Sequence, residues 1–191
     1  MEVERLQREY NVEVRWAPYL LNPSIPPEGK KREPQTNEDT PKSHLELMGE
    51  ARGVTFKRGR TFTPNSHKAL EAAEFAYAHG LDTDDFHRAL FKANFEDFEN
   101  IGDMDVLLRI ASENGIDSDG LRQALDSGEF TEQVDTQIEW ARSVGVTGIP
   151  TFIFDDKYAL VGAQEFDAFE QVMATLKDER AGGEDAAGAG S

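Results

Sequence analysis

The sequence predicts an α/β protein in which a block of helices interrupts an α/β core. Three observations support this prediction. Apolar and charged residues alternate over residues 12–16, as in a β-strand, and residues 63–145 carry apolar residues at helical spacing. Two short apolar runs, 151–154 and 158–161, flank polar turn residues, as in a hairpin. The predicted order is helix, strand, long loop, helical block, hairpin and helix.

The first elements lie before the helical block. Apolar residues at helical spacing predict a helix over residues 1–10, and no capping residue precedes it. The strand at 12–16 ends at Pro18. Residues 18–43 carry six prolines among charged and amide residues, which indicates an extended loop. A loop this long in a compact domain is either functional or poorly ordered.

The helical block contains five predicted helices, each with an apolar face and four of them with a start or stop signal. The start signals are Thr63–Pro64, Thr83 and Asp103, and the stop signals are Gly80, Gly115 and Gly145. The apolar faces are Leu70, Ala73 and Tyr77; Phe86, Ala89, Leu90 and Ala93; Leu107, Ile110 and Ala111; Leu121, Ala124 and Leu125; and Phe130, Val134, Ile138 and Ala141. The aromatic series that continues through Phe91, Phe95 and Phe98 is expected in the core.

The C-terminal elements follow Pro150. A proline cannot donate to a β-ladder, so Pro150 belongs at the start of its strand. Among X–Pro bonds in general trans is the more common conformation, and the residues alone do not decide between cis and trans for Ile149–Pro150. An amphipathic helix over residues 166–176 ends the ordered chain, and the acidic, Gly- and Ala-rich residues 178–191 are expected to be disordered.

Charge and composition exclude several functions. Twenty Lys and Arg against 37 Asp and Glu give a net charge of −17, which argues against binding to nucleic acid or anionic membranes. A salt-adapted host and an ordinary acidic protein both explain this charge. The chain has no cysteine, which excludes thiol catalysis by its own residues. Without a signal peptide or an apolar run near the roughly 18 residues of a membrane span, a cytoplasmic protein is expected.

No metal site is expected. His44, His67, His79 and His87 lack the spacing of metal ligands, so solvated positions are predicted for them. The acidic run at residues 96–99 is expected to be a loop between helices.

Several motifs resemble one family. The run Val-Thr-Gly-Ile-Pro-Thr-Phe-Ile-Phe at 146–154, then Asp-Asp-Lys-Tyr and Val-Gly-Ala-Gln, resembles the thioredoxin-like DsbA family, and in particular its FrnE-like branch. The same holds for Val-Glu-Val-Arg-Trp-Ala-Pro-Tyr-Leu-Leu-Asn-Pro at 12–23, Pro-Pro-Glu-Gly at 26–29, and Thr-Pro-Asn-Ser-His at 63–67. The resemblance covers about residues 3–177. It implies an α/β thioredoxin-like fold with an inserted all-helical domain.

The resemblance also implies domain boundaries. Residues 1–62 would form the incomplete N-terminal part of the thioredoxin-like domain, with its long Pro-rich loop. Residues 63–145 would form the helical insertion, 146–177 the C-terminal part of the core, and 178–191 the tail.

The resemblance further implies a substrate site. Pro150 would be the family's cis-proline, and Ile149 would offer its backbone to an extended substrate or to glutathione. The turn before the last helix would present free N–H groups to a carboxylate, although plain helix capping explains the same turn. The substrate-binding residues implied are Gly148, Ile149, Pro150, Gly162, Ala163 and Gln164. The implied partners are a thiol or disulfide protein substrate or a small thiol, with glutathione as a co-substrate; no nucleic acid and no membrane are expected.

The chain departs from the family pattern at its start. Family members begin with a strand followed by Cys-x-x-Cys, or a Ser variant, at the start of the first helix, whereas Met1 falls late in that helix. This implies an N-terminally truncated fold with no catalytic residue in this chain and a nucleophile upstream of Met1. A short protein whose sheet is rearranged, or completed by a partner, is the competing explanation.

Three functions therefore stay open. The first is a DsbA/FrnE-type thiol–disulfide oxidoreductase, without activity as the chain stands. The second is a glutathione-dependent isomerase or transferase of the 2-hydroxychromene-2-carboxylate isomerase or kappa type. The third is a non-catalytic peptide-binding module.

Overall fold

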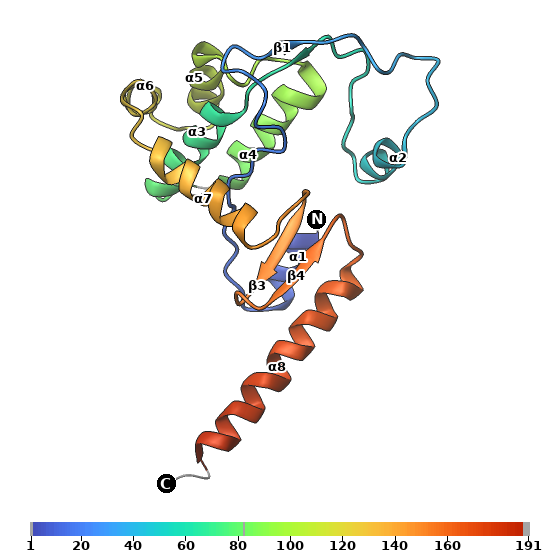
Figure 1. Cartoon of the computed structure of the whole chain (residues 1–191), viewed down its shortest axis with the longest axis vertical. Helices are drawn as coiled ribbons and strands as arrows, with labels where there is room; N and C mark the ends of the chain where they lie inside the picture. Colours follow the sequence, from blue (N-terminus) through green and yellow to red (C-terminus); the bar gives the residue numbers. More distant parts are fainter. Residues whose placement is uncertain (1, 82, 189–191) are drawn as a thin grey trace. The chain divides into compact units, whose positions relative to one another are not determined.

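The computed structural model describes residues 2–81 and 83–188 and divides into two compact units (Figure 1). The hairpin unit comprises residues 1–16 and 142–191, and the helical unit comprises residues 17–141. The boundary at 141/142, where the helical unit ends, lies near the predicted end of the helical insertion at residue 145. The first boundary lies at 16/17 rather than 62/63, because the long loop bonds to the segment that leads into the helices. Asn65 Nδ2, for example, donates to the carbonyl of Ile25 at 2.7 Å.

The hairpin unit contains two helices and one hairpin. These are α1 (Glu2–Glu9), β3 (Thr151–Phe154), β4 (Tyr158–Val161) and α8 (Phe166–Gly188). The strands are antiparallel, with Thr151 opposite Val161 and Phe154 opposite Tyr158. The predicted N-terminal helix and hairpin are therefore confirmed.

Aromatic packing holds the hairpin to both helices. Leu6 of α1 and Phe166 and Phe169 of α8 are buried together, and Phe152, Phe154 and Leu160 pack against them. The ring centroids of Phe152 and Phe169 lie 4.9 Å apart in an edge-to-face arrangement. One face of the hairpin thus forms the core of this unit.

Helix α8 extends beyond the predicted end of order. Residues 178–188, expected to be disordered, are helical, and residues 189–191 lie outside the described chain. Ion pairs hold the helix to the hairpin turn: Lys157 Nζ lies 3.2 Å from Glu179 Oε2, and Arg180 Nη2 lies 3.3 Å from Asp155 Oδ2. The Tyr158 hydroxyl also donates to Glu179. These hydrogen bonds, that of Tyr158 first, lower the pKa of Glu179.

The strand predicted at residues 12–16 does not form. Exposure alternates over residues 11–15, and Val12 packs against the core of the hairpin unit, as the pattern predicted. A ladder also needs a neighbouring strand, and no described segment pairs with these residues. The alternation of apolar and polar residues therefore predicts which side chains face the core. It does not predict whether a neighbouring strand is present to form a ladder.

The helical unit consists of six α-helices, one π-helical turn and a two-residue ladder within the described chain. The elements are α2 (His44–Ala51), α3 (His67–Ala78), α4 (Thr83–Lys92), η1 (Ala93–Asp97), α5 (Met104–Glu113), α6 (Ser118–Ser127) and α7 (Thr131–Ser143). Strands β1 (Lys30–Lys31) and β2 (Phe62–Thr63) are antiparallel. Apart from β1, residues 18–43 form the predicted loop.

Two helix starts differ from the prediction. Helix α2 was missed, although Ser43 and Glu46 form a reciprocal capping box at its start. Backbone and side-chain hydrogen bonds from Ser43 and one from Arg58 lower the pKa of Glu46 to about 2. Helix α3 begins at His67 rather than after Thr63, because Thr63 pairs with Lys30 in the β1–β2 ladder.

The core of the helical unit follows most of the predicted faces. Phe86, Leu90, Leu107, Ile110 and Leu121 are all buried in one cluster. Helix α3 is different, because it buries a face of small residues around Phe75, while Tyr77 is 45% exposed. Phe91 and Phe95 are 55% and 37% exposed, so the expectation that they lie in the core is wrong.

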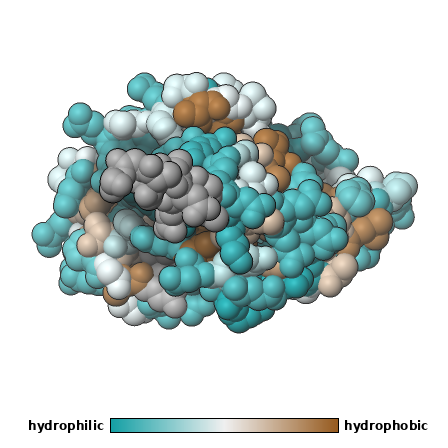
Figure 2. Space-filling model, turned by 90° about the horizontal axis from the view of Figure 1, so that it is seen from below, coloured by the Kyte–Doolittle hydropathy of each residue, from teal (hydrophilic) through white to brown (hydrophobic). Residues whose placement is uncertain are grey.

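The exterior reflects the composition. The face drawn in Figure 2 is mostly hydrophilic, with apolar residues in small separate areas. Among the described residues, no helix is long and apolar enough to cross a membrane.

The hairpin turn uses a backbone conformation that favours glycine. Asp155 and Asp156 have φ values of 54° and 55°, and Lys157 N donates to Phe154 O at 2.9 Å, as in a type I′ turn. Aspartate tolerates this region at a cost that glycine avoids.

We therefore expect Asp156→Gly to raise the free energy of unfolding by about 0.5 kcal/mol. Asp156→Val, with a β-branched side chain at positive φ, should lower it. Urea denaturation followed by circular dichroism measures both. Shifts of the same sign in the two variants would contradict the turn assignment.

His67 joins α3 to α7 through two carboxylates. Its Nδ1 lies 2.9 Å from Glu71 Oε1, and its Nε2 lies 2.9 Å from Asp135 Oδ1. Thr131 Oγ1 donates to Glu71 Oε2, the second oxygen of that carboxylate, and Glu71 is a buried residue. Burial of the ring lowers the pKa of His67, but the hydrogen bonds to Asp135 and Glu71 outweigh it and raise the pKa. His67 therefore bridges two carboxylates, which favour its protonated form, and it is not the solvated residue that the sequence predicted.

The raised pKa of His67 determines how its contribution to stability depends on pH. The contribution of His67 should be complete below about pH 6.5, the ordinary pKa of histidine, and should be lost as the pH rises through the higher folded-state pKa. We expect the difference in free energy of unfolding between the wild type and His67→Gln to shrink over that range. Asp135→Asn should give a smaller difference. Parallel pH profiles for the wild type and His67→Gln would disprove the bridge.

Candidate substrate-binding site

The hairpin register brings the two predicted site segments together. Gly162 N donates to Pro150 O at 2.8 Å, which continues the ladder by one pair beyond Thr151 and Val161. Thr151 Oγ1 donates to Gly148 O at 2.8 Å and ties the incoming loop to the strand. The Ile149–Pro150 bond is cis, the conformation implied by the family resemblance. All six predicted residues therefore lie at the open end of one hairpin.

The backbone of Ile149 is unpaired. Neither its N–H nor its C=O has a hydrogen-bond partner within the described residues. Its side chain is 56% exposed, and that of Val161, at the same end of the hairpin, is 57% exposed. An extended segment therefore meets free backbone groups beside exposed apolar surface at this position.

The free edge of β3 continues from Ile149. Because Pro150 O bonds to β4, the alternation of an antiparallel ladder turns the N–H and C=O groups of Thr151 and Ile153 away from β4. Within the described chain, β4 is the only strand that pairs with β3. The sequence reasoning missed Thr151 and Ile153 as site residues, although the period-two pattern after Pro150 was the signal that could have shown them.

The turn before α8 combines capping with free donors. Gln164 Nε2 donates to Val161 O at 2.7 Å, so this side chain serves the local turn. The N–H groups of Ala163 and Gln164 have no partner within the described residues. The capping interpretation therefore holds for the side chain of Gln164, and two donors stay available to a ligand.

The site carries no group for acid–base or nucleophilic chemistry. None of its six predicted residues has an ionisable side chain, and the chain has no cysteine. No three or more His, Asp or Glu side chains gather around a common point in the described part of the chain, as a metal ion would require. What the site offers is backbone hydrogen bonding and apolar contact.

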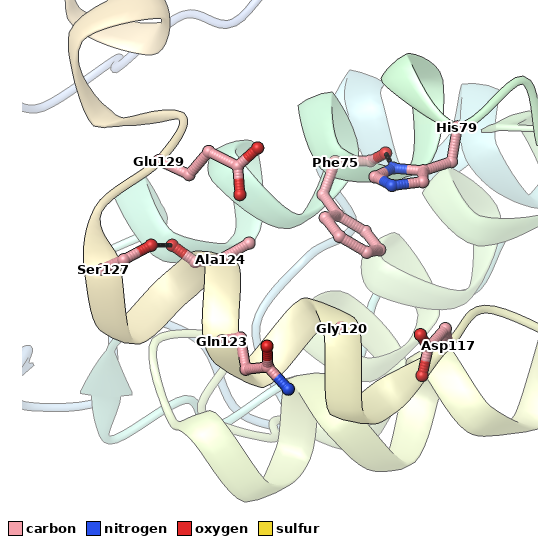
Figure 3. A pocket seen from close by; sticks show the side chains of 8 residues that line it. All are labelled: Phe75, His79, Asp117, Gly120, Gln123, Ala124, Ser127 and Glu129. Carbon is pink, nitrogen blue, oxygen red and sulfur yellow. Dashed lines mark hydrogen bonds between the residues drawn. The ribbon is translucent and has the colours of Figure 1, made fainter.

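A pocket of about 430 Å³ lies in the helical unit between α3 and α6 (Figure 3). Two of its polar side chains, those of His79 and Asp117, serve helix ends. His79 Nδ1 bonds to Phe75 O at 2.8 Å, and the carboxylate of Asp117 caps α6. None of the predicted site residues lines this pocket.

The geometry of the hairpin end depends on Gly162. Its φ is +84°, and a Cβ there would meet only Gln164 Nε2 at 3.8 Å, so the cost of a side chain is conformational rather than steric. We expect Gly162→Ala to lower the free energy of unfolding by about 1 kcal/mol.

Gly148→Ala is the matched control, because Gly148 has no left-handed backbone and a Cβ there meets open space. This variant should change stability by less than about 0.5 kcal/mol. Chemical denaturation compares the two, and equal losses would contradict the assigned role of Gly162.

Known proteins resemble this chain in sequence and structure. It is 27% identical over 166 residues to the uncharacterized protein YwbO of Bacillus subtilis, covering 86% of this chain and 82% of that protein. The structure of a probable DsbA oxidoreductase from Streptomyces coelicolor matches with a TM-score of 0.61 at 25% identity. That match covers 71% of this chain and 58% of the Streptomyces chain, so this chain spans less than two thirds of that protein.

A second solved structure shows the same fold. A 2-hydroxychromene-2-carboxylate isomerase matches with a TM-score of 0.62 at 17% identity, covering 94% of this chain and 88% of the isomerase. The family model of the DSBA-like thioredoxin domain matches residues 1–174, nearly the whole chain. The fold is therefore α/β and thioredoxin-like with a helical insertion, and the chain belongs to the DSBA-like thioredoxin domain family.

Proposed function

We propose that this protein is a thiol–disulfide oxidoreductase of the DsbA/FrnE type, without activity as the chain stands, and that its hairpin end binds the substrate backbone. The observation that carries the proposal is the unpaired backbone of Ile149 at the head of the free β3 edge. An extended polypeptide that adds to this edge receives main-chain hydrogen bonds from Ile149, Thr151 and Ile153 in alternation. We also propose a cytoplasmic location, which is the location expected from the sequence.

The chemistry of exchange needs a sulfur nucleophile. A thiolate attacks one sulfur of a disulfide, the S–S bond breaks, and a mixed disulfide forms while the other sulfur leaves as a thiolate. This sequence supplies no such sulfur. We therefore propose that the 191-residue chain binds an extended substrate and by itself leaves a disulfide unchanged.

A glutathione-dependent isomerase or transferase is the second candidate. One observation favours it: the N–H groups of Ala163 and Gln164 are unpaired, and such donors suit a carboxylate. A calorimetric titration with glutathione tests this second candidate, because the isomerase model requires binding of the tripeptide alone and fails if none is detected.

The binding site is tested with a permanently unfolded polypeptide, such as fluorescein-labelled, reduced and carboxymethylated α-lactalbumin. Pro150 restricts Ile149 to an extended conformation, so Pro150→Ala should loosen the backbone that receives the substrate. We expect Pro150→Ala and Ile149→Ala each to weaken binding about five- to tenfold in fluorescence anisotropy, which corresponds to about 1 to 1.4 kcal/mol.

Leu45→Ala is the control, because Leu45 is an exposed apolar residue of α2 with 60% exposure, close to the 56% of Ile149. It should leave the affinity unchanged. If Pro150→Ala binds like the wild type, or if Leu45→Ala loses as much as Ile149→Ala, the hairpin end is not the site.

A further inference from the structure

A row of cations crosses two loops of the helical unit. The β1–β2 ladder sets Lys30 opposite Thr63, and Arg32 N donates to Thr61 O at 2.9 Å. This pairing brings the basic residues of one loop beside those of the other. We name Lys31, Arg32, Lys57 and Arg60 the cationic strip.

The strip lacks carboxylate partners. Lys31, Arg32, Lys57 and Arg60 form no ion pair with any described residue. The chain carries 17 more carboxylates than cations. Arg58, which lies between Lys57 and Arg60 in the sequence, does form an ion pair, with Glu46 at 2.8 Å. The surplus of carboxylates has therefore not been used to neutralise these charges.

Aromatic rings and an amide position two of the cations. Arg60 lies over the rings of Phe98 and Phe95, at 4.6 and 5.7 Å from their centroids, and Lys57 lies 5.2 Å from that of Phe98. Arg60 Nη1 donates to Asn94 Oδ1 at 2.9 Å, and Nη2 donates to the carbonyl of the same residue.

The backbone beneath these contacts is irregular. Asn94 belongs to the π-helical turn η1, and Phe98, which ends the turn, has a left-handed φ of 60°. Such turns and such strained residues recur at functional sites. Burial, and next the charge of Arg32, lower the pKa of Arg60. Like charges are thus held close at a cost that a bound anion would relieve.

A cavity of about 410 Å³ opens beside the strip. It is lined by Lys31, Arg32, Glu33, Pro34 and Thr61. The guanidinium of Arg32, the ammonium of Lys31 and the hydroxyl of Thr61 offer several hydrogen-bond donors in one place. Glu33 contributes the single carboxylate of the lining. A ligand therefore needs at least two negative charges and several acceptor oxygens.

We propose that the cationic strip binds a phosphate group, either free or on a small phosphate ester. The three terminal oxygens of a phosphate match the fork of Arg32 together with Lys31 and Thr61 better than the two oxygens of a carboxylate. A long polyanion is disfavoured, because the net charge of −17 repels it beyond the strip.

The test titrates the full chain with inorganic phosphate, pyrophosphate and adenosine monophosphate, at constant ionic strength, by amide NMR shifts. We expect saturable shifts at residues 31–34 and 57–61. The Lys31→Gln/Arg32→Gln double variant should weaken binding about tenfold. Lys31 is exposed and Arg32 is half-buried, and the two substitutions leave Arg60 and the aromatic rings beneath it unchanged. Tighter binding of the nucleotide than of inorganic phosphate identifies an ester as the ligand, and the reverse order identifies the free ion.

The matched control is Lys68→Gln/Lys177→Gln, which removes the same charge at two exposed positions away from the strip in sequence. It should weaken binding less than twofold. Equal losses in the two double variants, or no saturable shift at residues 31–34, would overturn the proposal. So would tighter, Arg32-dependent binding of a 20-nucleotide single strand than of pyrophosphate, because the occupant would then be a nucleic acid.

Discussion

The contact of Phe169 with Phe152 and Phe154 is the interaction on which the candidate site depends. A two-stranded hairpin is marginally stable by itself in water, so β3 and β4 need an apolar surface to pack against. Helix α8 supplies that surface through Phe169, whose centroid lies 4.9 Å from that of Phe152 and 6.1 Å from that of Phe154. With this packing the register is fixed, and Pro150 lies beside Gly162. The site is thus a consequence of aromatic burial on the opposite face of the same strands.

Several of the many carboxylates have specific structural roles, in addition to those that lie on the solvated surface. Glu46 caps α2 and binds Arg58, Glu179 holds α8 to the hairpin turn, and Glu71 with Asp135 holds His67. Each of these contacts joins segments that are distant in the sequence or closes a helix end. The acidic composition therefore contributes directly to the tertiary structure.

The sequence predicted the features that are encoded locally. The hairpin at 151–161, the cap at Asp103 and the stop at Gly115 depend on neighbouring residues, and the structure confirms them. The strand at 12–16 and the helix start at Thr63 failed, because a ladder depends on a partner elsewhere in the chain. The failure at α2 was different, since the local Ser43–Glu46 signal was present and was overlooked.

The site residues were predicted from a family resemblance, but the reason they work together is visible only in three dimensions. Residues 148–150 and 162–164 meet because the turn closes the hairpin with one register, which the composition of neither segment specifies. The binding that we propose there relies on main-chain groups, which every polypeptide shares, so affinity for an extended chain would not require a particular sequence. Selectivity would then depend on the exposed side chains of Ile149 and Val161, which suit apolar residues in a bound segment. Recognition of the backbone is physically separable from sulfur chemistry, and our proposal assigns only the first to a chain without cysteine.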